Sequence, residues 1–141
     1  MKVYLASAKT NKEFMPAVEY YLKSKISYIE FTSIWYNAKP VQNNKERYET
    51  TILQGVDKAD LVIAIYPYGQ SGTLCEMTYA VGKGIPVIYV RSKEFEEEDP
   101  LIAGGFTNIT DIVEFNNNKW IATSLNVAIN CIITISNMIT K

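Results

Sequence analysis

Two uninterrupted apolar runs constrain most strongly what this chain can fold into. They read DLVIAIYP (60–67) and IPVIYVR (85–91), and both lack the alternation of polar and apolar residues that marks a strand with one face in water. Each run therefore predicts a strand that is buried on both faces of a parallel sheet. The segment TLCEMTYAVGKG (73–84) lies between them and predicts the crossover helix, which is closed by glycine.

The rest of the chain continues this alternation of strands and helices. Further strands are predicted at 2–8, 27–35 and 110–115, and further helices at 10–25, 45–59 and 120–140. The acidic segment 92–108 predicts a loop. Together these elements predict one α/β domain over residues 1–141, with a doubly wound, flavodoxin- or Rossmann-like fold. We expect a five-stranded parallel sheet of order 2-1-3-4-5, with helices on both faces.

Charge and composition exclude several classes of function. The formal net charge is −1, so the sequence predicts no nucleic-acid partner. The chain has no histidine, and its two cysteines, Cys75 and Cys131, lie far apart in the sequence. This composition predicts neither a metal site nor a disulfide framework, and nothing in the sequence calls for a cofactor. Free thiols are typical of a reducing compartment, so we expect a cytoplasmic protein.

The C-terminal segment 120–140 carries no charge over 21 residues, which is long enough to span a membrane. However, it has a narrow polar stripe at spacings of three and four, which would be costly in lipid. We therefore expect no membrane partner. The remaining apolar arc is wider than one sheet face can cover, which predicts a homodimer or a higher homo-oligomer. The stripe consists of Thr123, Asn126, Asn130, Thr134 and Asn137.

Glu76 is the only acidic residue between Asp60 and Glu94. With Thr73 it forms T-x-x-E, the spacing of a capping box, in which the glutamate would serve the helix start alone. Its position favours chemistry instead. In a doubly wound sheet, ligands bind where the winding reverses, at the carboxyl ends of the first and third strands, and Glu76 follows the third strand directly.

Residues 59–90 read ADLVIAIYPYGQSGTLCEMTYAVGKGIPVIYV. An Ala-Asp pair precedes an apolar strand, G-T-x-x-E follows the loop, and Gly-Lys-x-x-Pro-Val leads into the next strand. This pattern resembles the nucleoside 2-deoxyribosyltransferase family, including its nucleoside 5′-monophosphate N-hydrolase branch. The resemblance implies cleavage of an N-glycosidic bond, with Glu76 as the nucleophile that attacks C1′ and forms a glycosyl-enzyme. The family's first strand carries a tyrosine beside the nucleophile, which Tyr4 matches.

The residues around Glu76 predict how a nucleoside or nucleotide is held. Amides and hydroxyls at 71–73 suit a 5′-hydroxyl or phosphate, and Gln70 can read a base edge without donating a proton to it. A tryptophan similar to Trp35 occurs in some family members, although core packing is the favoured interpretation of this residue. The candidate substrate-binding residues are Ser7, Trp35, Gly69, Gln70, Ser71, Gly72 and Thr73.

The sequence departs from the family pattern at two acidic positions. Gln70 stands where the family usually has an aspartate, and Ile52 stands where it has another, with Glu49 one turn away. Transfer and hydrolysis therefore both remain open. A second resemblance, of GQSGTLCE (69–76) to phosphoribohydrolases with G-G-x-G-T-x-x-E, implies the same type of bond cleavage. Cys75 is expected to be a small core residue rather than a nucleophile.

Two other classes of function are compatible with the same residues. A nucleotide-binding module without turnover would keep the pocket and could lack the acidic partners. A structural homo-oligomer would depend mainly on the helix at 120–140. Release of a free base from a panel of nucleosides separates the enzyme from both.

Overall fold

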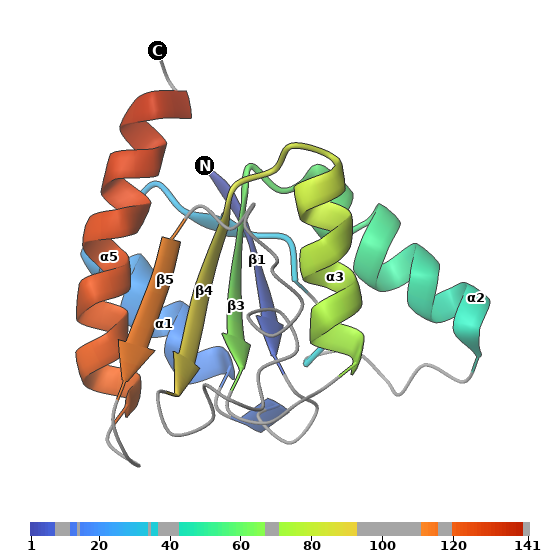
Figure 1. The fold of residues 1–141 in the computed structure, drawn as a ribbon, viewed down its shortest axis with the longest axis horizontal. Helices are drawn as coiled ribbons and strands as arrows, with labels where there is room; N and C mark the ends of the chain where they lie inside the picture. Colours follow the sequence, from blue (N-terminus) through green and yellow to red (C-terminus); the bar gives the residue numbers. More distant parts are fainter. Residues whose placement is uncertain are drawn as a thin grey trace.

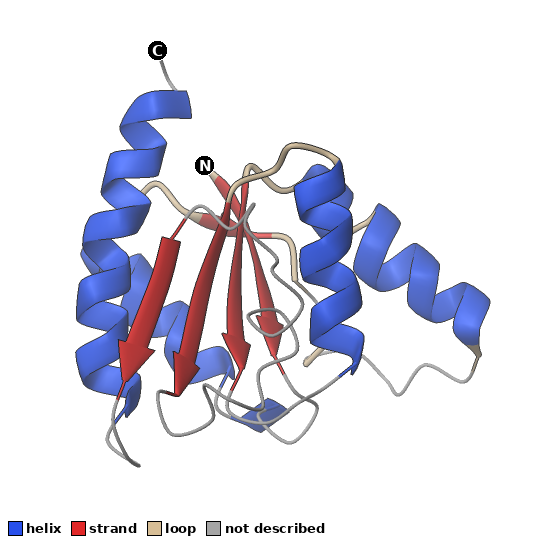
Figure 2. Cartoon of the chain, viewed as in Figure 1, coloured by secondary structure: helices blue, strands red, loops and turns tan. Residues whose placement is uncertain are grey.

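The computed structural model describes residues 1–7, 12–13, 15–33, 35–36, 43–66, 71–92, 111–115 and 120–139. Its centre is a parallel sheet of order β2-β1-β3-β4-β5 (Figures 1 and 2). All four strand pairs are parallel. The predicted α/β fold with a parallel sheet and helices is confirmed. The strands are β1 Lys2–Ser7, β2 Glu30–Phe31, β3 Leu61–Tyr66, β4 Val87–Ser92 and β5 Asp111–Phe115.

Helices cover both faces of this sheet. In Figure 1, α1 and α5 lie on one face, and α3 lies on the other with α2 beyond it. Among the described residues, none of the helices combines the length and apolar character needed to cross a bilayer. The helical segments are α1 Met15–Lys25, α2 Asn44–Arg47, the π-helix η2 Tyr48–Leu53, the 3-10 helix η3 Val56–Lys58, α3 Ser71–Gly82 and α5 Trp120–Ile139.

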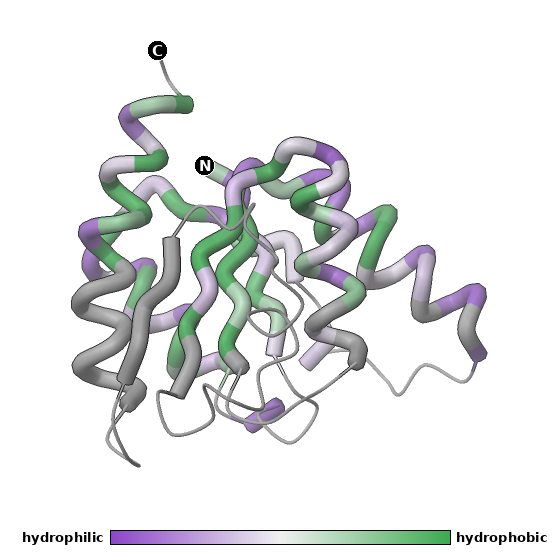
Figure 3. The backbone as a smooth tube through the Cα atoms, viewed as in Figure 1, coloured by the Kyte–Doolittle hydropathy of each residue, from purple (hydrophilic) through white to green (hydrophobic). Residues whose placement is uncertain are grey.

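The sheet separates two hydrophobic cores. In β3, Ile63 and Ile65 point to the face of α1 and α5, whereas Val62 and Ala64 point to the face of α3. Because both faces are covered, both sets of side chains are apolar, and this explains the continuous run in the sequence. The hydrophobic residues of β3 and β4 accordingly lie at the centre of the fold (Figure 3).

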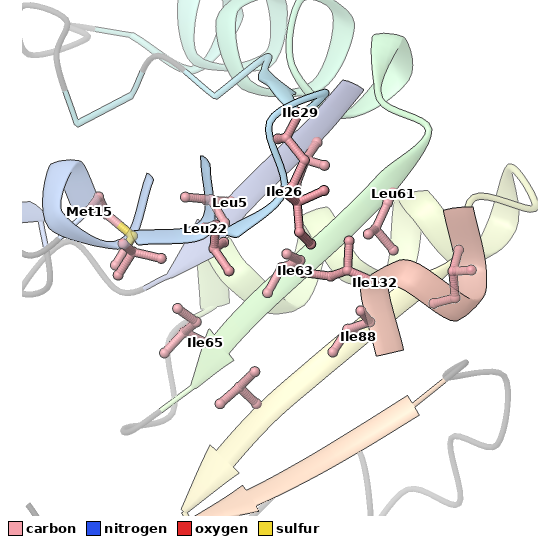
Figure 4. Packing of buried hydrophobic residues seen from close by; sticks show 14 of the residues in the cluster. Leu5, Met15, Leu22, Ile26, Ile29, Leu61, Ile63, Ile65, Ile88 and Ile132 are labelled. Atoms are coloured by element: carbon pink, nitrogen blue, oxygen red, sulfur yellow. The ribbon is translucent and has the colours of Figure 1, made fainter. Parts of the chain in front are cut away.

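We call the first cluster the α1/α5 core. It is built mainly from large aliphatic side chains of the strands and the two helices, and Figure 4 shows them interlocked over β3 and β4. The second cluster, the α3 core, combines strand residues with η2, η3 and α3. Its buried members are Tyr4, Ala6, Ile52, Val56, Ala59, Val62, Ala64, Met77, Ala80, Val87 and Tyr89.

The second strand is much shorter than the predicted 27–35, because a side chain takes over its hydrogen bonding. The amide of Thr32 still donates to the carbonyl of Val3, at 2.8 Å. The next acceptor on β1, the carbonyl of Leu5, receives instead the indole N–H of Trp35, at 2.7 Å. The edge of the sheet is thus completed by an indole where a strand amide was expected.

Two predicted helices also differ from the structure. The helix predicted at 10–25 begins at Met15, which puts Pro16 in its first turn, the only helical location where a missing N–H is harmless. The helix predicted at 45–59 is divided into α2, η2 and η3. At the end of η2 the amide of Gln54 donates to the carbonyl of Glu49 at 3.0 Å, five residues back, and Gly55 then directly precedes η3.

Candidate active site

Tyr4 and Glu76 meet in the interior of the protein. The Tyr4 hydroxyl donates a hydrogen bond to Oε1 of Glu76 at 3.0 Å, and the two residues are 72 positions apart in the sequence. Strand geometry places Tyr4, because Val3 and Leu5 point into the α1/α5 core and Tyr4 must therefore point toward α3. Glu76 is the sixth residue of α3 and lies on the side that faces the sheet.

This pair is almost completely shielded from solvent. Tyr4 has no exposed surface, and Glu76 is 8% exposed. A buried carboxylate is costly unless hydrogen bonds compensate for lost water, and a bond donated to the charged form is among the strong ones. A phenol that donates to a buried carboxylate can therefore offset part of this cost and fix the orientation of the carboxylate.

Thr73 lies one helical turn before Glu76, on the same side of α3. Its side chain is only 1% exposed, and its hydroxyl has no hydrogen-bond partner within the part of the chain that the structure describes. The capping-box interpretation is not supported, because α3 begins at Ser71 and Thr73 is already its third residue. The T-x-x-E spacing therefore puts two buried polar side chains on one face and does not mark the helix start.

Two other predicted site residues lie at the carboxyl end of β1. The Ser7 hydroxyl donates to the carbonyl of Ile65 at 2.9 Å, which joins β1 to β3 where the winding reverses. Trp35 is partly buried and packs against both cores, with its ring edge-on to Tyr36. The favoured packing role of Trp35 agrees with these contacts.

Tyr36, whose ring packs edge-on against Trp35, forms a buried pair of hydroxyls with Ser33. The Tyr36 hydroxyl donates to Glu19, and the Ser33 hydroxyl lies 2.9 Å from it. Burial raises the pKa of Tyr36 well above its ordinary value, and the carboxylate of Glu19 adds to this effect. Tyr36 is therefore neutral at every physiological pH and acts as a fixed donor.

The remaining predicted site residues fall into two groups. Gly69 and Gln70 lie outside the described residues, and Ser71 and Gly72 form the start of α3. Cys75 does not pack in the core as expected: it is exposed, because Thr73 and Glu76 take the sheet side of the helix. Within the described part of the chain, no group of three or more His, Cys, Asp or Glu side chains could hold a metal ion.

Of the two positions that depart from the family pattern, Gln70 lies outside the described residues and Ile52 is described. Ile52 is buried in the α3 core, and Glu49 is exposed. The neighbouring carboxylate therefore does not take the buried position of Ile52.

One residue beside the pair could not be assigned to the site from the sequence. Gly55 is buried, and a Cβ built on it would lie 2.5 Å from Cε2 and 2.8 Å from Cδ2 of the Tyr4 ring. A signal was available, because glycine interrupts the helical pattern predicted for 45–59. Nothing in that pattern showed which side chain would need the space.

This chain matches known proteins by its fold and not by its sequence. No family model matches the sequence, and no curated protein does. Among solved structures, the CMP N-glycosidase BcmB of Clostridium botulinum superposes with a TM-score of 0.60 at 20% identity, over 90% of this chain and 99% of that one. The chain shares the fold of this protein.

A second solved structure gives the same result. A conserved protein from Enterococcus faecalis V583 matches with a TM-score of 0.58 at 15% identity, over 90% of this chain and 87% of the other. The two structural matches support the α/β fold with a parallel sheet that the sequence predicts.

Proposed function

We propose that this protein cleaves the N-glycosidic bond of a (deoxy)nucleoside or a nucleoside 5′-monophosphate, with Glu76 as the nucleophile. The observation that carries the proposal is the buried hydrogen bond from Tyr4 to Glu76 between β1 and α3. Two further findings support it. The sequence of 59–90 resembles deoxyribosyltransferases, and a protein of the same fold is a CMP N-glycosidase.

The chemistry divides one difficult displacement into two steps. A carboxylate oxygen of Glu76 bonds to C1′, the C1′–N bond breaks, and its electron pair leaves with the base, which then takes a proton. The resulting glycosyl ester is cleaved by water, which gives hydrolysis, or by the nitrogen of a second base, which gives transfer. The transition state has oxocarbenium character, so an ionised carboxylate at C1′ stabilises it, as in retaining glycosidases.

Each predicted residue has a role in this scheme. Tyr4 orients the carboxylate of Glu76. The start of α3 offers the amides of Ser71 and Gly72 and the buried hydroxyl of Thr73 to a 5′-hydroxyl or phosphate, the kind of group that helix N-termini attract. The substrate-binding set is completed by Ser7 and Trp35 at the carboxyl side of β1, and by Gly69 and Gln70 in the loop before α3.

We further propose that the active form is a homodimer or a higher homo-oligomer. Among the side chains of α5 that the structure describes, three large apolar ones are exposed in the single chain: Ile133 at 39%, Met138 at 70% and Ile139 at 43%. A second subunit over this helix would remove them from water.

Cys75 and Cys131 are both free thiols, which supports a cytoplasmic site of action.

The alternative is a nucleotide-binding module without turnover. The observation in its favour is the buried Ile52 at a position where the resemblance implies an acid. Such a module would bind nucleotides with the same residues and release no base.

The deciding experiment is a panel of ribo- and deoxyribonucleosides and their 5′-monophosphates, with free base detected by chromatography. We expect release of one base, and addition of a second base shows whether transfer also occurs. Glu76→Gln should end this release, whereas Glu49→Gln, at an exposed acid, should not. Binding of a nucleotide without base release by the wild type would favour the module.

A further inference from the structure

Gly55 lies along one edge of the Tyr4 ring, between the π-helix η2 and the 3-10 helix η3. We infer that Gly55 is a positioning residue: its missing side chain leaves the space in which the Tyr4 ring must lie for its hydroxyl to reach Glu76. This inference rests on the proposed function for its effect on turnover, but the geometry behind it is independent of any substrate.

Space, and not the sign of φ, demands glycine here. The φ of Gly55 is −101°, which any residue can adopt. Its hypothetical Cβ, however, would lie 2.5 Å from the carbonyl oxygen of Thr51 and 2.5 Å from Cε2 of Tyr4. The backbone of η2 stands on one side and the phenol ring on the other. A side chain can be admitted only if the Tyr4 ring or the η2 backbone moves.

The position of Gly55 is itself tied to the strand that carries Tyr4. The carbonyl of Gly55 accepts a hydrogen bond from the Thr32 hydroxyl at 2.9 Å. The amide of Thr32 donates to the carbonyl of Val3, the residue before Tyr4. Gly55 is therefore held at a fixed distance from β1, and the Tyr4 ring lies between this loop and the rest of the α3 core.

The size of the clash sets the expected effect. Carbon atoms in contact prefer a separation of about 3.5–4.0 Å, so a new Cβ displaces the ring or the loop by roughly 1 Å. A hydrogen bond of 3.0 Å does not survive such a displacement without rearrangement. Misplacement of a reacting group by about 1 Å can cost roughly a hundredfold in rate.

Three variants separate positioning from general damage. Gly55→Ala introduces the clash. Thr32→Val removes the hydroxyl that holds Gly55 without adding volume, and it keeps the test usable if Gly55→Ala does not fold. Gly82→Ala is the matched control, because nothing lies within 4 Å of the Cβ that it adds. Each is made with Tyr4 intact and also combined with Tyr4→Phe, which keeps the ring and removes only the hydroxyl.

The first readout needs no activity. Chemical denaturation of Tyr4→Phe, Glu76→Ala and the double variant, in which each single change removes the hydrogen bond, gives the coupling between the two side chains. We expect measurable coupling in the wild type and in Gly82→Ala, loss of it in Gly55→Ala and a reduction in Thr32→Val. Absence of coupling in the wild type, or unchanged coupling in Gly55→Ala and Thr32→Val, overturns the inference.

The second readout is turnover of the substrate that the nucleoside panel identifies. With Tyr4 intact, kcat should fall by up to about a hundredfold in Gly55→Ala and less in Thr32→Val. In the Tyr4→Phe background both changes should have little further effect on kcat, although any loss of stability should persist. Equal losses of kcat in both backgrounds contradict the inference. If the wild type turns over no substrate, the proposed function fails, and the coupling experiment still decides the role of Gly55.

Discussion

The hydroxyl of Tyr4 and Oε1 of Glu76 lie 3.0 Å apart, and their hydrogen bond ties the second turn of α3 to the first strand of the sheet. Both side chains can be replaced by groups of nearly the same shape. Their contributions to turnover and to stability can therefore be measured separately.

Glu76→Gln should abolish turnover and leave the protein folded. The amide oxygen of Gln still accepts the hydrogen bond from Tyr4, so the free energy of unfolding should change by no more than about 1–2 kcal/mol. The amide is not a nucleophile, so kcat should fall by at least roughly 10⁴-fold. Base release and a denaturation curve of the same preparation check both statements. Near-normal turnover in the folded variant would rule out a nucleophilic role.

Tyr4→Phe should lower both turnover and stability. The ring keeps its packing, but the carboxylate of Glu76 loses a buried donor, at a cost of about 1–3 kcal/mol in the free energy of unfolding. Loss of the donor that orients the nucleophile should lower kcat about 10- to 100-fold, with a smaller change in KM. Tyr20→Phe is the control, because Tyr20 is 80% exposed and should tolerate the change. A change confined to KM would show that Tyr4 acts on binding instead.

Thr73→Val should raise KM without destabilising the protein. Val has nearly the shape of Thr, and the hydroxyl that it removes is buried without a partner among the described residues. Removing such a group should leave the melting temperature unchanged or raise it. If the hydroxyl binds the 5′ end of the substrate, KM should rise about tenfold. A lower melting temperature with unchanged KM would assign Thr73 to the fold alone.

Met138→Lys should weaken self-association. Met138 is the most exposed apolar side chain described on α5, so a charge there should disrupt a helical contact in a dimer while leaving the single chain folded. Light scattering at micromolar concentration should show a dimer or larger species for the wild type and a shift toward monomer for the variant. Asn130→Lys, on the exposed polar stripe, serves as control. A wild-type monomer of 16.0 kDa would contradict the proposal.

The buried strands were predictable because their side chains on both faces are apolar, and that pattern is visible in the sequence. The short β2 was not, since the indole of Trp35 completes its hydrogen bonding and no pattern of strand residues records this. The division of the predicted helix 45–59 into three shorter helical segments could not be predicted from the sequence either. The spacing of Tyr48, Ile52 and Val56 suggested one helical face, yet Tyr48 is 50% exposed while the other two are buried.

The candidate site shows the same contrast. The location of Glu76 after the third strand could be predicted from chain order, and its partner Tyr4 came from the family resemblance. The alternation of side chains along a strand also places Tyr4 on the α3 side of the sheet, once Val3 and Leu5 are assigned to the other face. The outward direction of Cys75 and the close contact of Gly55 with the ring depend on how α3 and η2 are rotated against the sheet, which sequence spacing does not fix.

The unequal make-up of the two cores has a consequence for how such a protein can evolve. Alanine is absent from the buried members of the described α1/α5 core, whereas Ala6, Ala59, Ala64 and Ala80 belong to the α3 core beside Tyr4. Stabilisation by burial scales with apolar area, so among the described residues the α1/α5 core, which has more buried members and no alanine, should contribute more of it than the α3 core. Under the proposed function, substitutions around α3 that change substrate preference would leave the larger side chains of the α1/α5 core in place, so such changes can occur before the fold is lost.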